Sequence, residues 1–159
     1  MRGLAQRLVL FVCSGNTSRS PMAQALCNDE ILRRLGLSLE RLDNLPLRAV
    51  SAGLTVLPGR PLSTAAQSTL QQLGMARYQH SSREITPELV EQAERIFCMT
   101  DGQCRSLVSR FPESATKVKR LDPEGDIEDP SSQDLPVFLS LAVRIQSSVR
   151  HRVSEMVPA

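Results

Sequence analysis

The sequence contains no tryptophan, a single tyrosine, two histidines and no long run of apolar residues. No stretch approaches the ~20 apolar residues that a membrane-spanning helix needs, so we expect no membrane partner. Near the N-terminus, five apolar residues run from Leu8 to Val12, fewer than the roughly 7–15 that form a signal-peptide core. We therefore predict a buried strand at this position and a cytoplasmic location.

Cysteine and histidine are too sparse and too scattered for a metal site. The four cysteines form no C-x-x-C pair and have no histidine at ligand spacing, which argues against the common zinc motifs. We expect no metal and no cofactor, and no disulfide framework in an intracellular chain of this length. The net charge of +2 is too mild to indicate a nucleic-acid partner.

The order of apolar and helical segments predicts the fold class. The length of 159 residues fits a single domain over residues 1–159, because one core can serve a chain of this size. Predicted strands alternate with predicted helices, which indicates an α/β fold: a single three-layer domain whose central four-stranded parallel sheet carries helices on both faces. The strands are expected at 7–12, 47–52, 95–99 and 117–121, and the helices at 20–35, 61–73, a short segment opening at 86–88, 102–111 and 134–153. Residues 152–159 are expected to fray.

The spacing C-x5-R is weak evidence for a catalytic loop here, because it occurs three times. Cys27 to Arg33 and Cys104 to Arg110 both fit it. Both segments fall inside predicted helices, where the backbone amides are already committed to helical hydrogen bonds. We therefore interpret these two matches as coincidence.

The third match, Cys13 to Arg19, lies between a predicted strand and a predicted helix. In a parallel sheet, ligands bind at the carboxyl ends of the strands, where this loop is expected. Gly15 and Asn16 adopt left-handed conformations at low cost, so successive N–H groups can point inward as an anion-binding nest. A helix N-terminus and a nearby arginine favour the thiolate form of a cysteine. This pattern predicts that Cys13 is a nucleophile and that Arg19 binds phosphate oxygens through its planar fork.

The segment from Leu8 to Ala23, which reads LVLFVCSGNTSRSPMA, resembles the signature of low-molecular-weight protein tyrosine phosphatases. The likeness continues at residues 51–53, 80–86, 99–100 and 126–130, in matching order over nearly the whole chain. The resemblance implies a cysteine-dependent protein phosphatase that acts on a phosphorylated protein and releases inorganic phosphate.

The resemblance also implies roles for individual residues. Cys13 would form a phosphocysteine, Arg19 would bind the phosphoryl group, and Asp129 would be the general acid and then the base that activates water. Asp129 is preferred to Asp122, the other aspartate that precedes a proline, and Asp126 is the reserve. The loop residues expected to bind phosphate are Ser14, Gly15, Asn16, Thr17, Ser18 and Arg19. The residues expected to support the loop by hydrogen bonds are Asn16, Ser20, Ser51 and His80, with Ser20 also stabilising the thiolate.

Three departures from the family pattern bear on substrate and redox control. Ser18 stands where many members have a second cysteine able to form a reversible disulfide with the nucleophile, so that switch should be absent. Ser131 and Ser132 follow the Asp-Pro pair where an aromatic wall is usual, which removes stacking worth about 0.5–1.5 kcal/mol for a phosphotyrosine ring. At the mid-loop position, Thr17 matches the threonine that the protein-arginine phosphatase branch of the family carries. The hydroxyl of that threonine helps to position water.

The family resemblance makes phosphotyrosine the first expected substrate. The missing aromatic residue and Thr17 make phosphoarginine the alternative. Two further hypotheses stay open. The first is a thioredoxin-coupled arsenate reductase that uses Cys98 and Cys104 as relay thiols, although Cys98 falls inside a predicted strand, where a buried hydrophobe is the common interpretation. The second is a catalytically silent phosphate-binding protein.

Overall fold

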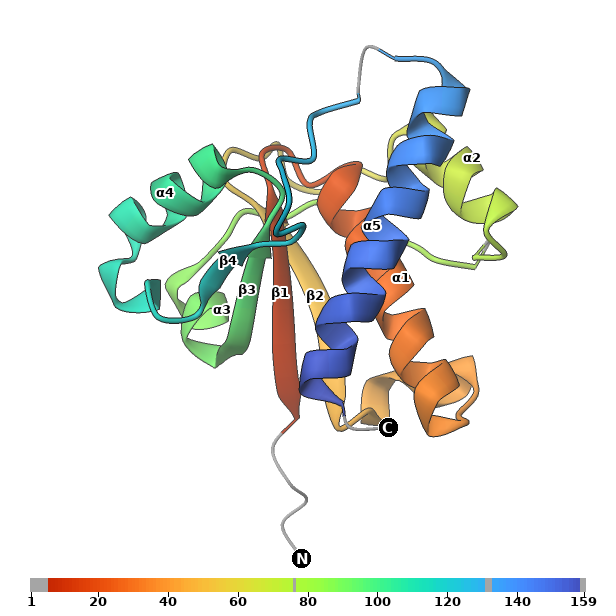
Figure 1. The fold of residues 1–159 in the computed structure, drawn as a ribbon, viewed down its shortest axis with the longest axis horizontal. Helices are drawn as coiled ribbons and strands as arrows, with labels where there is room; N and C mark the ends of the chain where they lie inside the picture. The colour runs from red at the N-terminus through yellow and green to blue at the C-terminus, as the bar shows by residue number, and fades with distance from the viewer. Residues whose placement is uncertain (1–5, 76, 131–132, 158–159) are drawn as a thin grey trace, which may run out of the picture.

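The computed structural model describes residues 6–75, 77–130 and 133–157. It shows a parallel sheet in the strand order β2-β1-β3-β4, with helices packed on both faces (Figure 1). Strand β1 is flanked on both sides, so the loop that follows it leaves from the middle of the sheet. The elements in chain order are β1 (Arg7–Cys13), α1 (Arg19–Leu35), the 3-10 helix η1 (Leu39–Asn44), β2 (Leu47–Gly53), α2 (Thr64–Gln72), α3 (Pro87–Gln92), β3 (Ala93–Cys98), α4 (Asp101–Arg110), the 3-10 helix η2 (Pro112–Ser114), β4 (Val118–Arg120) and α5 (Leu135–Met156).

The helices divide between the two faces of the sheet, which confirms the predicted three-layer architecture. Alternate residues of a strand point to opposite faces, and β1 supplies both cores. Phe11 packs with α1, α2 and α5 on one face, whereas Leu10 and Val12 pack on the face covered by α3 and α4 (Figure 1). Among the described residues, no helix combines the length and the apolar character that crossing a membrane requires.

Capping residues set several helix boundaries at the predicted places. Helix α1 ends at Gly36, which has a positive φ of 66° and donates its N–H to the carbonyl of Arg33. The Thr86 hydroxyl accepts the N–H of Leu89 at the start of α3, where Pro87 occupies the first turn as expected. These contacts satisfy backbone groups that a helix end leaves unpaired.

Helix α2 begins later than predicted. It starts at Thr64 rather than at residue 61, because the Ser63 hydroxyl accepts a 3.2 Å hydrogen bond from the Ala66 N–H and makes Ser63 the N-cap. The serine cap three residues before Ala66 outweighs the preference of Pro61 for a first helical turn.

The C-terminal segment does not fray from residue 152 as predicted, since α5 continues to Met156. Arg152 is 6% exposed and donates to the carbonyl oxygens of Leu121 at 3.1 Å and Arg120 at 2.8 Å. Its guanidinium also lies 4.9 Å from the centre of the Phe97 ring, a cation–π contact. One buried arginine therefore holds the end of α5 to the sheet.

Candidate active site

The segment 13–19 connects β1 to α1 at the carboxyl edge of the sheet, as predicted. The end of β2 holds it in place: Leu54 N–H donates to the Cys13 carbonyl and Thr55 N–H to the Ser14 carbonyl, both at 3.0 Å. A Cβ on Gly53 would lie 2.6 Å from the Ser14 oxygen, so this close approach needs glycine. The two other C-x5-R matches lie within α1 and α4 (Figure 1), which confirms that they form no such loop.

The turn of the loop is made by Asn16 rather than by Gly15 and Asn16 together. Asn16 has φ of 59° and is the only non-glycine residue with a positive φ in the described part of the chain, and Gly15 does not have one. Of the two residues expected to adopt a left-handed conformation at low cost, only Asn16 does so. A Cβ on Gly15 would find its nearest neighbour, the Thr17 hydroxyl, 3.9 Å away, so space lies beside this position.

The Asn16 side chain lies fully buried at the centre of a hydrogen-bonded cluster beneath the loop. Its Nδ2 donates to the Ser20 hydroxyl at 2.9 Å and to the Ser51 hydroxyl at 3.0 Å, while its Oδ1 accepts the Arg83 N–H at 3.0 Å. The His80 Nε2 donates to the Asn16 carbonyl at 2.6 Å. The structure thus brings Asn16, Ser20, Ser51 and His80 together as the sequence predicts.

His80 is itself held by Tyr78, which the sequence analysis did not identify. Because His80 Nε2 donates to a carbonyl, its Nδ1 accepts the Tyr78 hydroxyl proton across 3.2 Å. Burial lowers the pKa of His80 and favours this neutral ring, with the charge of Arg83 adding to the shift. Burial also raises the pKa of Tyr78, so its hydroxyl stays protonated and able to donate.

Cys13 lies at the start of the loop and is 3% exposed. Its Sγ is 2.9 Å from the oxygen of the Ser20 hydroxyl. In the thiolate form, the sulfur would accept a hydrogen bond that this hydroxyl donates. Helix α1 begins at Arg19 without a side-chain cap, so its first N–H groups point toward the loop end. The arrangement suits an anion held next to the Cys13 sulfur.

Arg19 joins the loop to the segment that carries Asp129. Its Nη1 donates to the Ile127 carbonyl at 2.9 Å, and the residue is 5% exposed. A cleft of about 480 Å³ opens above, and its lining includes Ser14, Arg19, Leu54, Thr55, Thr100, Gln103, Glu128 and Asp129. Asp129 is exposed and faces the same cleft as the loop, as the proposed acid must.

Asp126, the reserve candidate for the acid, is engaged elsewhere. Its Oδ1 accepts the Asp101 N–H at 2.9 Å and pairs with the Arg120 guanidinium at 3.1 Å. These two contacts lower the pKa of Asp126, the Asp101 N–H most strongly. A carboxylate held in its charged form by such partners is a poor proton donor, which favours Asp129.

Ser18 and Thr17 connect the loop to α2. The Ser18 hydroxyl lies 2.7 Å from that of Ser63, and Ser63 N–H donates to the Thr17 carbonyl at 3.0 Å. Ser18, which stands where the family resemblance implies a second cysteine, therefore carries a hydroxyl that contacts the N-cap of a neighbouring helix. The predicted loss of the aromatic wall at Ser131 and Ser132 lies outside the described residues.

Gln103 in α4 is a second residue that the sequence analysis missed. Its Nε2 donates to the Ser14 hydroxyl at 3.1 Å, while its Oε1 accepts the N–H groups of Met99 and Thr100. The Thr100-x-x-Gln103 spacing is a capping box, so the sequence contained a signal for the cap. That spacing gives no sign of the contact with Ser14, 89 residues away.

Cys98 and Cys104, the two thiols of the relay hypothesis, lie close enough to interact. Their hydrogen bond raises the pKa of the buried Cys98 and lowers that of the half-buried Cys104. Cys98 ends β3 and is fully buried, so the interpretation of this residue as a core hydrophobe is confirmed.

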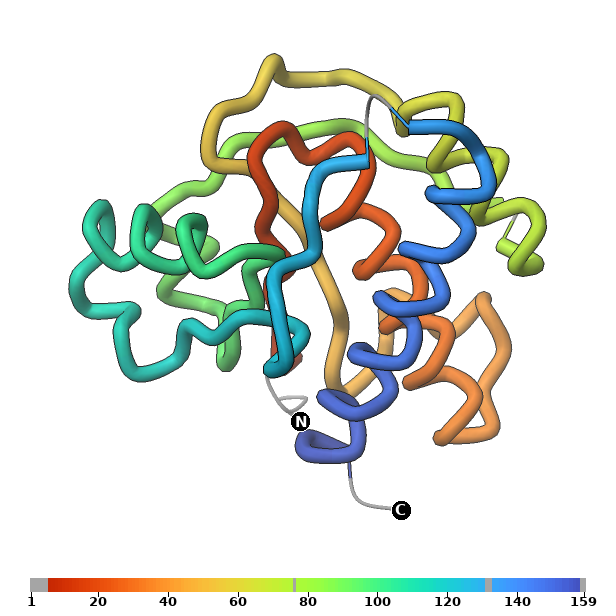
Figure 2. The backbone as a smooth tube through the Cα atoms, turned by 45° about the horizontal axis from the view of Figure 1, so that its top comes forward, coloured from red at the N-terminus to blue at the C-terminus, as the bar shows by residue number. Residues whose placement is uncertain are grey.

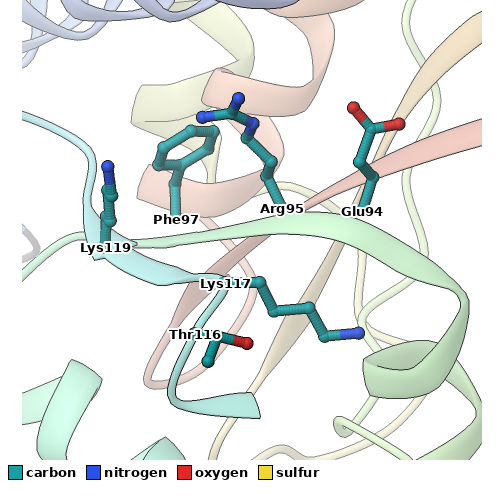
Figure 3. Close-up of a pocket in the computed structure, with 6 residues that line it drawn as sticks. All are labelled: Glu94, Arg95, Phe97, Thr116, Lys117 and Lys119. Carbon is teal, nitrogen blue, oxygen red and sulfur yellow. The ribbon is translucent and has the colours of Figure 1, made fainter.

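A separate hollow of about 330 Å³ lies along the edge strand β4, away from the loop. Figure 3 shows Arg95 and Lys119 on either side of the Phe97 ring, with Lys117 on the other side of the strand. Lys117 donates to the Ala93 carbonyl at 2.8 Å. Lys117 and Lys119 are the only lysines of the chain, and such charges protect an exposed strand edge from pairing with other chains.

Comparison with known proteins places these features in a family context. The family model described as low molecular weight phosphotyrosine protein phosphatase matches residues 8–157. The probable low molecular weight protein-tyrosine-phosphatase EpsP of Ralstonia solanacearum is 32% identical over 145 residues, covering 90% of this chain and 91% of that protein. A protein-arginine-phosphatase of Geobacillus stearothermophilus is 33% identical over 135 residues, covering 82% of each chain. The solved low molecular weight protein tyrosine phosphatase of T. tengcongensis has a TM-score of 0.80 at 30% identity, covering 94% of this chain and 99% of that one.

Proposed function

Because this chain belongs to the low molecular weight phosphotyrosine protein phosphatase family, we propose that it hydrolyses phosphorylated side chains of proteins through a phosphocysteine on Cys13. The observation that carries the proposal is the position of the Cys13 sulfur, 2.9 Å from the Ser20 hydroxyl at the start of a loop whose turn is fixed by the buried Asn16. The same loop is followed directly by the first N–H groups of α1.

The first step transfers the phosphoryl group from substrate to enzyme. The Cys13 thiolate attacks phosphorus, the bond to the leaving group breaks, and Asp129 gives its proton to the departing atom. Arg19 and the N–H groups of residues 14–19 bind the phosphoryl oxygens, so the developing charge meets donors that are already in place.

The second step returns the enzyme to its starting state. Asp129, now a carboxylate, takes a proton from water, and the resulting hydroxide attacks phosphorus and expels the Cys13 thiolate. Inorganic phosphate leaves, and Asp129 carries the proton again. Ser20 donates to the thiolate in the resting state, while Asn16, Ser51 and His80 keep the loop in shape without touching substrate.

Phosphotyrosine is the first proposed substrate, because the family description and the Ralstonia relative both name it. Phosphoarginine is the second candidate, and the cleft supplies a specific observation in its favour. None of the described residues lining the cleft is aromatic, while Glu128 places a carboxylate there. A guanidinium would gain from that charge, whereas a phenyl ring would find only Leu54 to pack against.

The remaining expectations follow from the sequence and the family. We expect phosphorylated proteins as substrates, no metal or other cofactor, no nucleic-acid or membrane partner, and a cytoplasmic location. The charge balance at the loop supports metal independence, since Arg19 and the backbone N–H groups supply the positive potential that a metal would otherwise provide.

The test compares phosphotyrosine and phosphoarginine peptides of one sequence as substrates of the purified protein, with a chelator present throughout. Phosphate release from either peptide is expected to disappear in Cys13→Ser, which should still bind orthovanadate. Turnover that survives in Cys13→Ser contradicts the mechanism. Absence of hydrolysis in the unaltered protein would favour the silent phosphate-binding alternative, and arsenate reduction with thioredoxin that is lost in Cys104→Ser would favour the reductase.

A further inference from the structure

One hollow lies outside the active-site cleft, on the α1 side of the sheet. It is a groove of about 600 Å³ between α1, the 3-10 helix η1, and residues 74, 75 and 77–79. The segments after α1 and after α2 both lie on the α1 side of the sheet, away from α4 (Figure 2). A concave volume of this size is typical of small-molecule sites rather than of flat protein interfaces.

One wall of the groove is apolar and open to solvent. Leu37 and Leu39 line it and are 37% and 51% exposed, beside the less exposed Leu42 and Met75. Two exposed leucines next to a hollow form a patch that gains free energy when an apolar molecule covers it.

The other lining groups give the groove a positive charge. Arg33, Arg48 and Arg77 contribute three guanidinium groups, against the single carboxylate of Asp29. Arg33 is itself paired, with Asp29 at 3.5 Å and with Glu30 at 3.2 Å, so the charge left for a ligand comes from Arg48 and Arg77. The charge of the groove therefore complements an anionic ligand.

Arg48 supplies the observation that identifies the ligand's polar group. Its Nη1 pairs with Asp43 at 3.0 Å, yet its Nε is buried without a hydrogen-bond partner, the only such side-chain nitrogen or oxygen within the described residues. A buried donor without an acceptor destabilises a protein by about 1–3 kcal/mol. The Arg48 side chain as a whole is 32% exposed, so a rotation that exchanges the Asp43 contact for a ligand would bring the Nε–H to an acceptor in the groove. A carboxylate fits, because its two oxygens match the side of an arginine fork.

We propose that this groove is a second ligand site, which binds an apolar molecule carrying one carboxylate, the carboxylate at Arg48 and the apolar body against Leu37 and Leu39. The groove is separate from the phosphate loop. Two of its lining residues nevertheless hydrogen-bond to side chains that hold the loop in place. Tyr78 and Gln24 line the groove, and they hydrogen-bond to His80 and Ser51, two of the side chains that contact Asn16.

Tyrosine fluorescence provides a direct measurement, since Tyr78 is the only tyrosine and the chain has no tryptophan. Decanoate, kept below its micelle concentration, is titrated into the full chain in the presence of saturating inorganic phosphate, which occupies the loop. We expect a saturable change in emission. Decan-1-ol, which has the same chain length and no charge, should bind at least ~10-fold more weakly because it lacks the charge-assisted hydrogen bond.

Matched variants separate the groove from general charge effects. Arg48→Gln should weaken decanoate binding by about 10-fold or more, whereas Arg41→Gln, which removes the same charge from η1 outside the groove lining, should leave it unchanged. Leu39→Ser should weaken binding by about 5-fold. Leu57→Ser is its control, because Leu57 is 66% exposed and lies outside the groove. Circular dichroism verifies that each variant is folded.

Four results would overturn the proposal: no saturable change with decanoate, equal binding of decan-1-ol, an equal loss in Arg41→Gln, or weaker decanoate binding with saturating phosphate than without it. Light scattering at the same concentrations provides a fifth result that would overturn it. If the chain self-associates and decanoate abolishes this association, the groove binds a second copy of the chain and not a small molecule. No turnover is measured, so failure of the proposed phosphatase activity and failure of this site give separate results.

Discussion

Replacing Asn16 tests whether one buried side chain fixes the shape of the loop. Asn16→Ala removes two donated hydrogen bonds, to Ser20 and Ser51, and the one accepted from the Arg83 N–H. It also places alanine at φ of 59°, where a Cβ is strained. Asn16→Gly removes the same hydrogen bonds but leaves the backbone relaxed.

The expected magnitude follows from those contacts. The Arg83 N–H loses its buried acceptor, which costs about 1–3 kcal/mol, and the two hydroxyls each lose a bond worth about 0.5–1.5 kcal/mol. Left-handed strain adds about 1 kcal/mol for alanine. We therefore expect the free energy of unfolding to fall by about 3–7 kcal/mol in Asn16→Ala, and by about 1 kcal/mol less in Asn16→Gly.

Urea unfolding followed by far-UV circular dichroism measures both changes, provided that the m-value stays constant. Asn44→Ala is the control, since Asn44 is exposed on η1 and should change stability by no more than about 0.5 kcal/mol. A loss below about 1 kcal/mol in Asn16→Ala would refute the argument from buried hydrogen bonds. An Asn16→Gly variant less stable than Asn16→Ala would refute the argument from backbone strain.

Three further predictions concern pH, packing and catalysis. Burial and then the charge of Arg83 lower the pKa of His80 in the folded state, so the unfolded chain binds more protons near ~6.5 and stability should fall as the pH drops through and below that value. His80→Gln should flatten that slope in urea unfolding between about pH 5 and 7, and an unchanged slope would contradict the role of His80. Arg152→Met should lower the free energy of unfolding by about 2–4 kcal/mol, because one buried and one partly buried carbonyl lose a charged donor. A change within ~0.5 kcal/mol would show that Arg152 is dispensable. Asp129→Asn should reduce kcat/KM for phenyl phosphate more than for p-nitrophenyl phosphate, since only the poorer leaving group needs the proton in the first step, and an equal loss in kcat/KM would argue against the acid.

The sequence predicted the architecture well because its signals are local. The apolar run before Cys13, the proline in the first turn of α3 and the glycine after α1 each act within a few residues, and each lies where expected. The start of α2 was misplaced where two local signals competed, and the hydrogen bond of Ser63 decided the outcome.

The support of the candidate site was only partly predictable, since its contacts join residues far apart in sequence. Asn16 and Ser20 are four residues apart, but His80 reaches the Asn16 carbonyl across 64 residues and Gln103 reaches Ser14 across 89. The family resemblance indicated His80. Gln103 and Tyr78 carried no local sign of their contacts, because a cap or a lone aromatic residue serves many folds equally well.

The attachment of α5 has a consequence for how the protein is synthesised. The face of β1 that carries Phe11 is covered by α1 and α5, and Arg152 fastens α5 to the sheet. At ~5–20 residues per second, roughly 7–30 s separate the synthesis of Cys13 from that of Met156. During that interval the apolar strand has left the ribosome without its final cover, so a molecular chaperone has most to contribute before α5 emerges.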